Sequence, residues 1–183
     1  VRTVSPTAVF AEHGLITVGE NGEFLDYAAC CKSTALSAQV WLKDPQDMKV
    51  YEKTRELLDF MCREGIYGIS RVYTAEEAQR EERLAGGFSF VLESDGYSAF
   101  TNDWLRPIVK NLDVTDYRFG RATHGHHPDK GPQPTMMAFG PSFRPGAVVD
   151  RRPLVDQAAT FAKVLGLDLG DIDGKVIGEI LNP

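Results

Sequence analysis

The chain has 183 residues, of which 43% are hydrophobic and 25% charged, a composition typical of one globular domain with its own core. Its 20 basic and 26 acidic residues give a net charge of −6, which disfavours binding to the phosphate backbone of nucleic acid. No apolar run approaches the roughly 18 residues of a membrane span, and the first residues lack the apolar stretch of a signal peptide. We therefore expect neither a nucleic-acid polymer nor a membrane as partner.

The cysteines Cys30, Cys31 and Cys62 indicate a reducing environment. Their number is odd and no two have C-x-x-C spacing, so neither a disulfide framework nor a zinc ribbon is expected. We interpret them as reduced thiols that act as small apolar side chains, with a catalytic thiol as the less favoured alternative. Reduced thiols predict a cytoplasmic protein.

In chain order, the first predicted elements are a short β-rich run at 15–18, a turn at 20–23 and a strand at 38–42. From about Asp47 to Arg63, apolar residues recur at helical spacing. Asp47 can cap the start of this helix, and Gly65 can end it in a left-handed turn.

A second strand is predicted at 69–73, followed by a polar helix from Thr74 to Glu82. Thr74 and Glu77 form the pattern of a capping box at its start. This helix has almost no apolar face, so we expect it to lie exposed. The segment 88–93 is the most β-prone of the chain, and Asp95-Gly96 breaks it.

Three further elements are predicted: a short strand at 117–119, a buried strand at 135–139 and an amphipathic helix at 153–165 that begins with Pro153. The apolar positions of that helix are Leu154, Ala158, Phe161 and Leu165, and an apolar tail holds Val176, Ile177 and Ile180. Strands alternate with helices, which predicts an α/β or α+β fold with a mixed sheet and flanking helices. Residues 1–183 are expected to form a single unit.

Three of the four histidines, His124, His126 and His127, lie within four positions of a loop rich in Gly, Pro and Asp. Gly125 allows the backbone to turn tightly beside the imidazoles. Their spacing is not that of a structural zinc motif, which uses cysteines or histidines one helical turn apart. From spacing alone, a solvated loop with incidental histidines is favoured over metal binding, and both readings stay open.

The residues around and after this loop favour a metal site. Thr123-His124-Gly125, a Pro-rich spacer and the run MMAFGPSF at 136–143 resemble the closing segment of the alkaline phosphatase superfamily, in its nucleotide pyrophosphatase/phosphodiesterase-like branch. The resemblance implies that His124 is a ligand of one of two catalytic zinc ions, other divalent metals being possible. It gives no metal role to His126 or His127, and Ala122 replaces a glycine that is common in the family.

The resemblance spans most of the chain, although only 123–143 is distinctive. Less specific matches are Val9-Phe10 with 13–16, and the strand at 38–44. Members of the family also need a Thr or Ser nucleophile, a further Asp and an Asp-His pair, and this sequence contains no Asp-His dipeptide. Together with the first residue, which is not Met, this suggests the C-terminal portion of a larger catalytic domain, inactive by itself.

The function implied by the resemblance is that of a zinc-dependent phosphoesterase, a type I phosphodiesterase/nucleotide pyrophosphatase-like hydrolase. Its substrate would be a small phosphate ester or phosphonate, and a hydroxyl nucleophile would form a covalent phospho-enzyme that is then hydrolysed. Two alternatives remain. The chain could be a complete noncatalytic domain that binds a ligand or partner, or a stand-alone metal-binding module that uses the three loop histidines.

Three residues are candidates for lining a substrate pocket: Asp95, Trp104 and His126. Asp95 is more often the residue of a plain turn, and Trp104, which could stack on a nucleobase, is more often part of a core. Asp129 and Lys130 could contact substrate phosphate, but solvated loop charges are the commoner interpretation.

Overall fold

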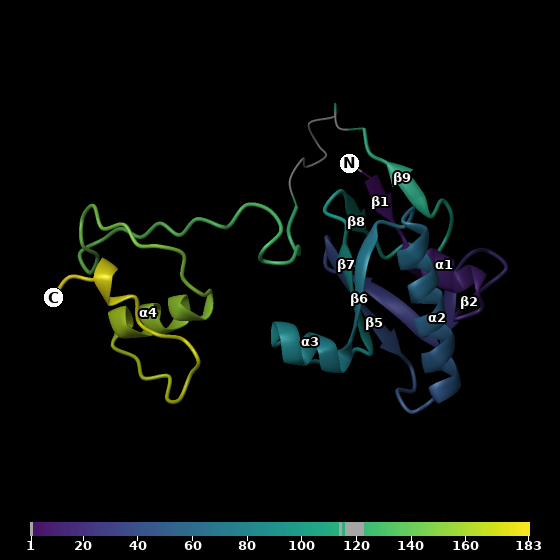
Figure 1. Ribbon diagram of the computed structural model, residues 1–183, viewed down its shortest axis with the longest axis horizontal. Coiled ribbons are helices and arrows are strands. Elements are labelled where there is room, and N and C mark those ends of the chain that lie inside the picture. The colour runs from purple at the N-terminus through teal and green to yellow at the C-terminus, as the bar shows by residue number, and fades with distance from the viewer. Residues whose placement is uncertain (1, 114, 116–122) are drawn as a thin grey trace. The chain divides into compact units, whose positions relative to one another are not determined.

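The computed structural model describes residues 2–113, 115 and 123–183 (Figure 1). The chain divides into two units, Val1–Pro132 and Gln133–Pro183, and each is described by itself. The described residues contain helices and sheets, with helices beside the strands, which confirms the expected α/β or α+β class. Among these residues, no helix has both the length and the apolar character needed to cross a membrane.

The larger sheet of the first unit consists, in spatial order, of the antiparallel strands β4 (Ala29–Ser33), β5 (Ser37–Leu42), β7 (Phe90–Ser94) and β6 (Ile69–Thr74). Strand β7 is buried along its whole length, since side chains pack on both faces of the sheet. On β5 the pattern alternates, and Ala38, Val40 and Leu42 point into the larger core. The strands predicted at 38–42, 69–73 and 88–93 are thereby confirmed.

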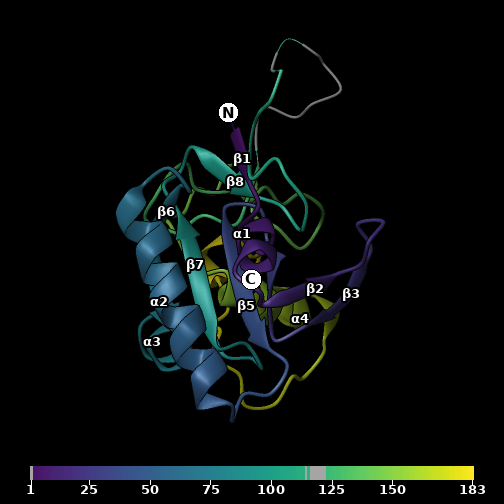
Figure 2. The ribbon, with the colours of Figure 1, turned by 90° about the vertical axis from the view of Figure 1, so that its right-hand side faces the viewer.

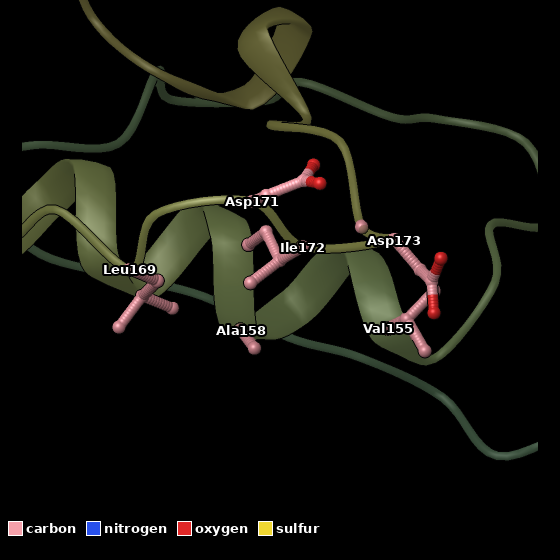
Figure 3. A pocket seen from close by; sticks show the side chains of 7 residues that line it. Val155, Ala158, Leu169, Asp171, Ile172 and Asp173 are labelled. Carbon is pink, nitrogen blue, oxygen red and sulfur yellow. The ribbon is translucent and has the colours of Figure 1, made fainter.

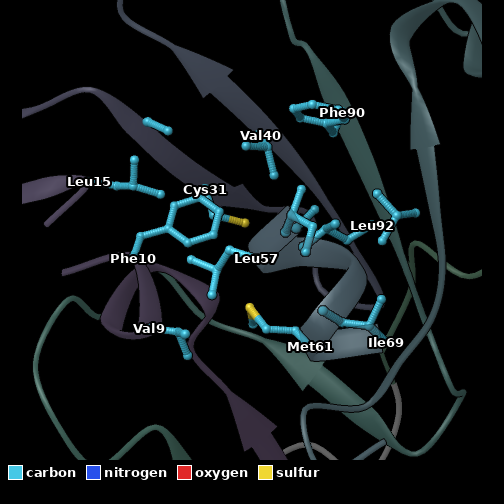
Figure 4. Close-up of a cluster of buried hydrophobic side chains, with 14 of the residues drawn as sticks. Val9, Phe10, Leu15, Cys31, Val40, Leu57, Met61, Ile69, Phe90 and Leu92 are labelled. Atoms are coloured by element: carbon cyan, nitrogen blue, oxygen red, sulfur yellow. The ribbon is translucent and has the colours of Figure 1, made fainter. Parts of the chain in front are cut away.

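Helix α2 (Met48–Glu64) covers one face of this sheet and runs beside β6 and β7 (Figure 2). Its ends are those predicted: the side chain of Asp47 accepts hydrogen bonds from the first turn, and Gly65 ends the helix in the left-handed conformation. Leu58 and Met61 are fully buried and belong to the same core cluster as Phe10. Figure 4 shows Met61 and Phe10 among the side chains of this cluster. Each such buried aliphatic side chain stabilises the fold by about 1.5–3 kcal/mol.

The opposite face of the sheet carries helix α3 (Ala75–Glu82). The capping box is formed as predicted, because Thr74 Oγ1 accepts from the Glu77 amide and the Glu77 carboxylate accepts from the Thr74 amide. Ala78 is the buried residue of α3, so the expectation of an exposed helix is confirmed. The small apolar cluster under α3 consists of Tyr73, Ala78, Phe88 and Val91, with Trp41 and Ala75 at its border.

A smaller mixed sheet has the strands β8 (Ser98–Phe100), β1 (Arg2–Val4) and β9 (Val109–Asn111), with β1 parallel to β8 and antiparallel to β9. Helix α1 (Pro6–Glu12) follows β1, capped by Ser5. The sequence patterns predicted neither β1 nor α1. Residues 6–10 are all buried, so α1 lacks the amphipathic periodicity by which helices are recognised.

The β-rich run at 15–18 and the turn after it are confirmed as part of a hairpin. Strands β2 (Ile16–Val18) and β3 (Phe24–Tyr27) pair antiparallel, with an irregularity between Thr17 and Val18. Leu15, just before the hairpin, is buried in the larger core.

The second unit is built on helix α4 (Val155–Leu165) and the short 3-10 helix η1 (Gly178–Ile180). Thr160 ties α4 to the C-terminal tail, because its hydroxyl donates to the Asp156 carbonyl and accepts from the Ile177 amide. Ile177 and Ile180 are buried, as expected of the apolar tail, whereas Val176 is 44% exposed.

Two details of α4 differ from the prediction. Pro153 lies outside the helix, before the N-cap residue Leu154. The buried stripe holds Ala159, Thr160 and Ala162, while Leu154, Phe161 and Leu165 are exposed. Asp156 and Thr160 accept hydrogen bonds from backbone amides of the C-terminal tail, so the face of α4 that carries them packs against the tail. The face predicted from the apolar residues is therefore the exposed one.

The strand predicted at 135–139 is not present, and the prediction of a buried strand is wrong. Met137 is 86% and Phe139 93% exposed, and no strand pairs with this segment among the described residues. A strand needs a neighbour for its backbone groups, and a run of apolar residues does not specify one. The strand predicted at 117–119 lies outside the described residues.

Candidate functional site

The histidine loop, defined here as residues 123–132, belongs to the first unit and lies on the turn that joins β4 to β5. The carbonyl oxygen of His124 accepts a hydrogen bond from the Leu36 amide at 3.0 Å. Gly125 has a φ of +85°, and a Cβ at this position would overlap the carbonyl oxygen of Thr34. Two features therefore require glycine at position 125: the left-handed backbone, and the close approach of this residue to the Thr34 carbonyl.

The three loop imidazoles have different surroundings, and that of His127 is fully occupied. Its Nδ1 accepts the amide hydrogen of Asp129 at 3.2 Å, and its Nε2 lies 3.1 Å from Oε1 of Glu82 on α3. Because Nδ1 is an acceptor, the proton of the neutral ring is on Nε2 and is donated to the carboxylate. Neither nitrogen of His127 has a lone pair left for a metal.

His124 is exposed, and within the described part of the chain its imidazole makes no hydrogen bond or ion pair. Both ring nitrogens therefore retain their capacity to bind a ligand. His126 is half-buried, with its ring against Gly131, where a Cβ would lie 3.2 Å from Nε2. Hydrogen bonding thus separates His127 from the other two histidines, and exposure separates His124 from His126.

Lys130 anchors the far end of the loop to the sheet. Its Nζ lies 2.8 Å from Oε1 of Glu93 and 3.2 Å from the hydroxyl of Ser70. Glu93 is on the central strand β7 and only 6% exposed, so the ammonium compensates a buried carboxylate. Lys130 is an exposed loop charge, as the commoner interpretation predicts, and it also pairs with a nearly buried acid.

Tyr73 and Arg71, on β6, lie next to the polar cluster formed by Lys130, Glu93 and Ser70. The Tyr73 hydroxyl lies 3.5 Å from Oε2 of Glu93, and burial together with the Glu93 charge raises the pKa of Tyr73. The Arg71 guanidinium lies 3.9 Å from the centre of the Tyr73 ring and pairs with Glu81 of α3 at 2.6 Å. Charges of both signs therefore lie between α3 and the sheet.

The described residues contain no group of three or more His, Cys, Asp and Glu side chains placed to hold one metal ion. A catalytic zinc site uses three protein ligands and an open position. The free imidazole of His124 fits one such ligand position. One imidazole does not make a zinc site, so the described residues by themselves hold no such ion.

Asp95 lies in the turn between β7 and β8, as the commoner interpretation predicts. Its Oδ1 accepts from the amides of Tyr97 and Ser98, both at 2.8 Å. Its Oδ2 lies 3.3 Å from the guanidinium of Arg2 and accepts from the Ser98 hydroxyl. Burial alone would raise the pKa of Asp95, but these hydrogen bonds and the Arg2 charge outweigh it and lower the pKa.

Trp104 contacts the β2–β3 hairpin. Its indole nitrogen donates to the Gly22 carbonyl at 2.8 Å, and its ring meets Phe24 edge-on, with 5.6 Å between centroids. The histidine loop, in contrast, contacts the β4–β5 turn. The three candidate pocket residues therefore lie in three different local settings: Asp95 in a turn, Trp104 on a hairpin and His126 in the loop.

Two hollows in the described part of the chain contain none of these candidate residues. One, of about 450 Å³, lies in the second unit beside α4 and is lined by Val155, Ala158, Leu169 and Ile172, with Asp171 and Asp173 at its rim (Figure 3). The other, of about 310 Å³, lies between the β2–β3 hairpin and the start of α2 and contains the Lys43–Asp26 ion pair.

Glu82, Glu93 and Leu36 are parts of this site that the sequence analysis did not identify. Glu82 is 45 positions from its partner His127, and Glu93 is 37 positions from Lys130. Leu36 is 88 positions from His124. The one available signal is Glu93, a charged residue inside the most β-prone segment, since buried charges are rare without a partner.

The chain matches no family model, and no curated protein and no solved structure is significantly similar to it.

Proposed function

We propose that this chain is the C-terminal part of a zinc-dependent phosphoesterase and supplies one metal ligand, the imidazole of His124. The observation that carries the proposal is a coincidence of two independent criteria. The T-H-G and G-P-S-F pattern singles out His124 by resemblance, and His124 is also the loop histidine whose ring is exposed and unpaired.

In this proposal the zinc ions supply Lewis acidity, which draws charge from the phosphoryl oxygens and lowers the pKa of a hydroxyl nucleophile. The residues of this chain contribute geometry. Gly125 fixes the backbone against Thr34, and the Leu36 amide holds the His124 carbonyl, so the imidazole is carried on a loop seated on a sheet. The nucleophile and the other ligands belong to the rest of the proposed catalytic domain.

A stand-alone zinc module built from all three loop histidines is less well supported, because both ring nitrogens of His127 are hydrogen-bonded. A noncatalytic binding domain remains the main alternative. It differs in its consequences, since it requires neither zinc nor a free ring on His124.

The test measures zinc content and hydrolysis of bis(p-nitrophenyl) phosphate for the complete protein, with His124→Ala compared with His13→Ala. His13 is the histidine outside the loop, so its replacement controls for loss of an imidazole. Removal of a ligand should lower kcat/KM by more than the about 10–100-fold typical of groups that only orient a ligand. His13→Ala should keep full activity and zinc.

The isolated 183-residue chain should hydrolyse no substrate and bind zinc more weakly than about micromolar, since one imidazole does not make a site. Full activity of the complete His124→Ala protein would contradict the proposal. Submicromolar stoichiometric zinc binding by the isolated chain would support the three-histidine module instead.

A further inference from the structure

The histidine loop is held to the sheet at three points that lie in order along it. The first is the backbone hydrogen bond between the His124 carbonyl and Leu36, the second is the contact of His127 with Glu82, and the third is the ion pair of Lys130 with Glu93. The partners belong to different elements: the β4–β5 turn, α3 and β7. These three contacts fix where the loop lies on the sheet, and thereby where each side chain between them is placed.

The third contact is difficult to replace. Glu93 is nearly buried, and a buried carboxylate without a cation is strongly unfavourable. Its other close polar contact is the Tyr73 hydroxyl at 3.5 Å, which is long for a hydrogen bond. The ammonium of Lys130, 2.8 Å from Oε1, is therefore its main charge compensation, as an ion pair without hydrogen-bond geometry, and this pair favours the loop staying on the sheet.

The second contact decides which imidazoles a cation can meet. Three imidazoles within four residues of a free loop would compete for one metal ion. In the structure, the Asp129 amide and Glu82 occupy both nitrogens of His127. The ring of His124, three residues earlier, has no such partner in the described residues.

We propose that Glu82 and Lys130 are positioning residues, which hold the loop so that a divalent cation meets His124 and not His127. This inference rests on the proposed role of His124 as a ligand. Neither residue would contact the metal: Glu82 lies on α3 and Lys130 lies in the loop. Together they would determine which of the neighbouring histidines binds the cation. Glu82 keeps His127 from the cation by accepting a hydrogen bond from its Nε2–H, and Lys130 holds the loop in the position in which that contact forms.

The experiment titrates the protein with zinc chloride and follows the ring resonances of each histidine by NMR. In the unmodified chain, the His124 signals should shift at zinc concentrations about tenfold below those that move His127, since His127 must first give up a charge-assisted hydrogen bond. Glu82→Gln should bring the two midpoints within about threefold of each other. The matched control is Glu81→Gln on the same helix, which pairs with Arg71 and Arg80 and should keep the order.

Lys130 is tested with two variants, so that loss of the contact is separated from loss of the fold. Lys130→Met should bring the midpoints together and speed exchange of the Leu36 amide, whereas Lys130→Arg should retain the order. Lys110→Met, which removes another half-exposed lysine that is paired with Asp103, controls for the charge. A change of unfolding free energy alone would not alter the order of the midpoints.

The possible failures are distinct. If zinc moves His127 or His126 before His124 in the unmodified chain, the proposed function of His124 fails. If His124 responds first and still does so by tenfold in both Glu82→Gln and Lys130→Met, the ligand role stands and the positioning role is overturned.

Discussion

Replacement of Gly125 by Ala should detach the histidine loop from the sheet. Two costs add at this position. Its φ of +85° lies in the left-handed region, and the new Cβ would overlap the Thr34 carbonyl oxygen and lie 3.3 Å from the Leu36 nitrogen. The second cost is borne by backbone atoms, which cannot rotate away as a side chain can.

Gly96 separates the two costs. Its φ is +87°, and a Cβ there would have no neighbour within 4 Å. The left-handed backbone should therefore cost both variants about 1–2 kcal/mol. Gly125→Ala should lose a further amount of about 1–3 kcal/mol through the overlap, or through release of the loop and its contacts.

Urea unfolding of both variants gives the difference in free energy, and hydrogen exchange of the Leu36 amide gives the state of the loop. Faster Leu36 exchange is expected in Gly125→Ala alone. Equal losses of stability in the two variants, with Leu36 exchange unchanged in both, would refute the placement of the loop on the β4–β5 turn.

Three further predictions concern the first unit. Ala35→Gly, in the turn under the loop, should stabilise the protein by about 0.5–1 kcal/mol, because Ala35 has a φ of 72°; a loss of stability in urea would contradict the backbone conformation. Asp95→Asn should remove a contribution of about 1–2 kcal/mol that depends on pH. The folded pKa of Asp95 is lowered, so its contribution should be complete above about pH 4 and disappear as the pH falls through that lowered pKa; a wild-type-minus-variant difference that stays constant from pH 2 to 6 would count against it. Leu58→Ala, at a fully buried position, should cost about 2–5 kcal/mol, whereas Leu25→Ala, at a position 59% exposed, should change the unfolding free energy by less than about 0.5 kcal/mol; similar values for the two would refute the assignment of the core.

The elements that sequence analysis predicted well are those specified locally. Asp47 and Gly65 mark the ends of α2, and Thr74 with Glu77 marks the start of α3. Caps act through backbone groups two to four residues away, so a single sequence contains all the information needed. For the same reason, the left-handed backbone of Gly125 was foreseeable.

The elements it missed are specified by packing. Helix α1 is buried on all sides over 6–10, and β4 carries Cys30 and Cys31, which have no clear strand pattern. The apolar run at 135–139 shows the opposite error, since its composition suited a strand but nothing in it indicated a partner. Patterns report which side chains are apolar, and packing determines which of them are covered.

For the candidate site, the tripeptide at 123–125 singled out His124 by resemblance alone, and the surroundings of the loop could not be derived. The contacts of His127 with Glu82 and of Lys130 with Glu93 join residues that are far apart in sequence and come together when the sheet forms. These contacts add that His127 is fully hydrogen-bonded, whereas the ring of His124 is exposed and has no partner among the described residues.

Anomalous diffraction at the zinc edge, from crystals of the zinc-loaded complete protein, tests the central claim most directly. We expect a zinc ion about 2.0–2.1 Å from a ring nitrogen of His124. In the same map, His127 should remain hydrogen-bonded to Glu82. Zinc bound by His126 or His127 with His124 unligated, or no zinc at this loop, would contradict it.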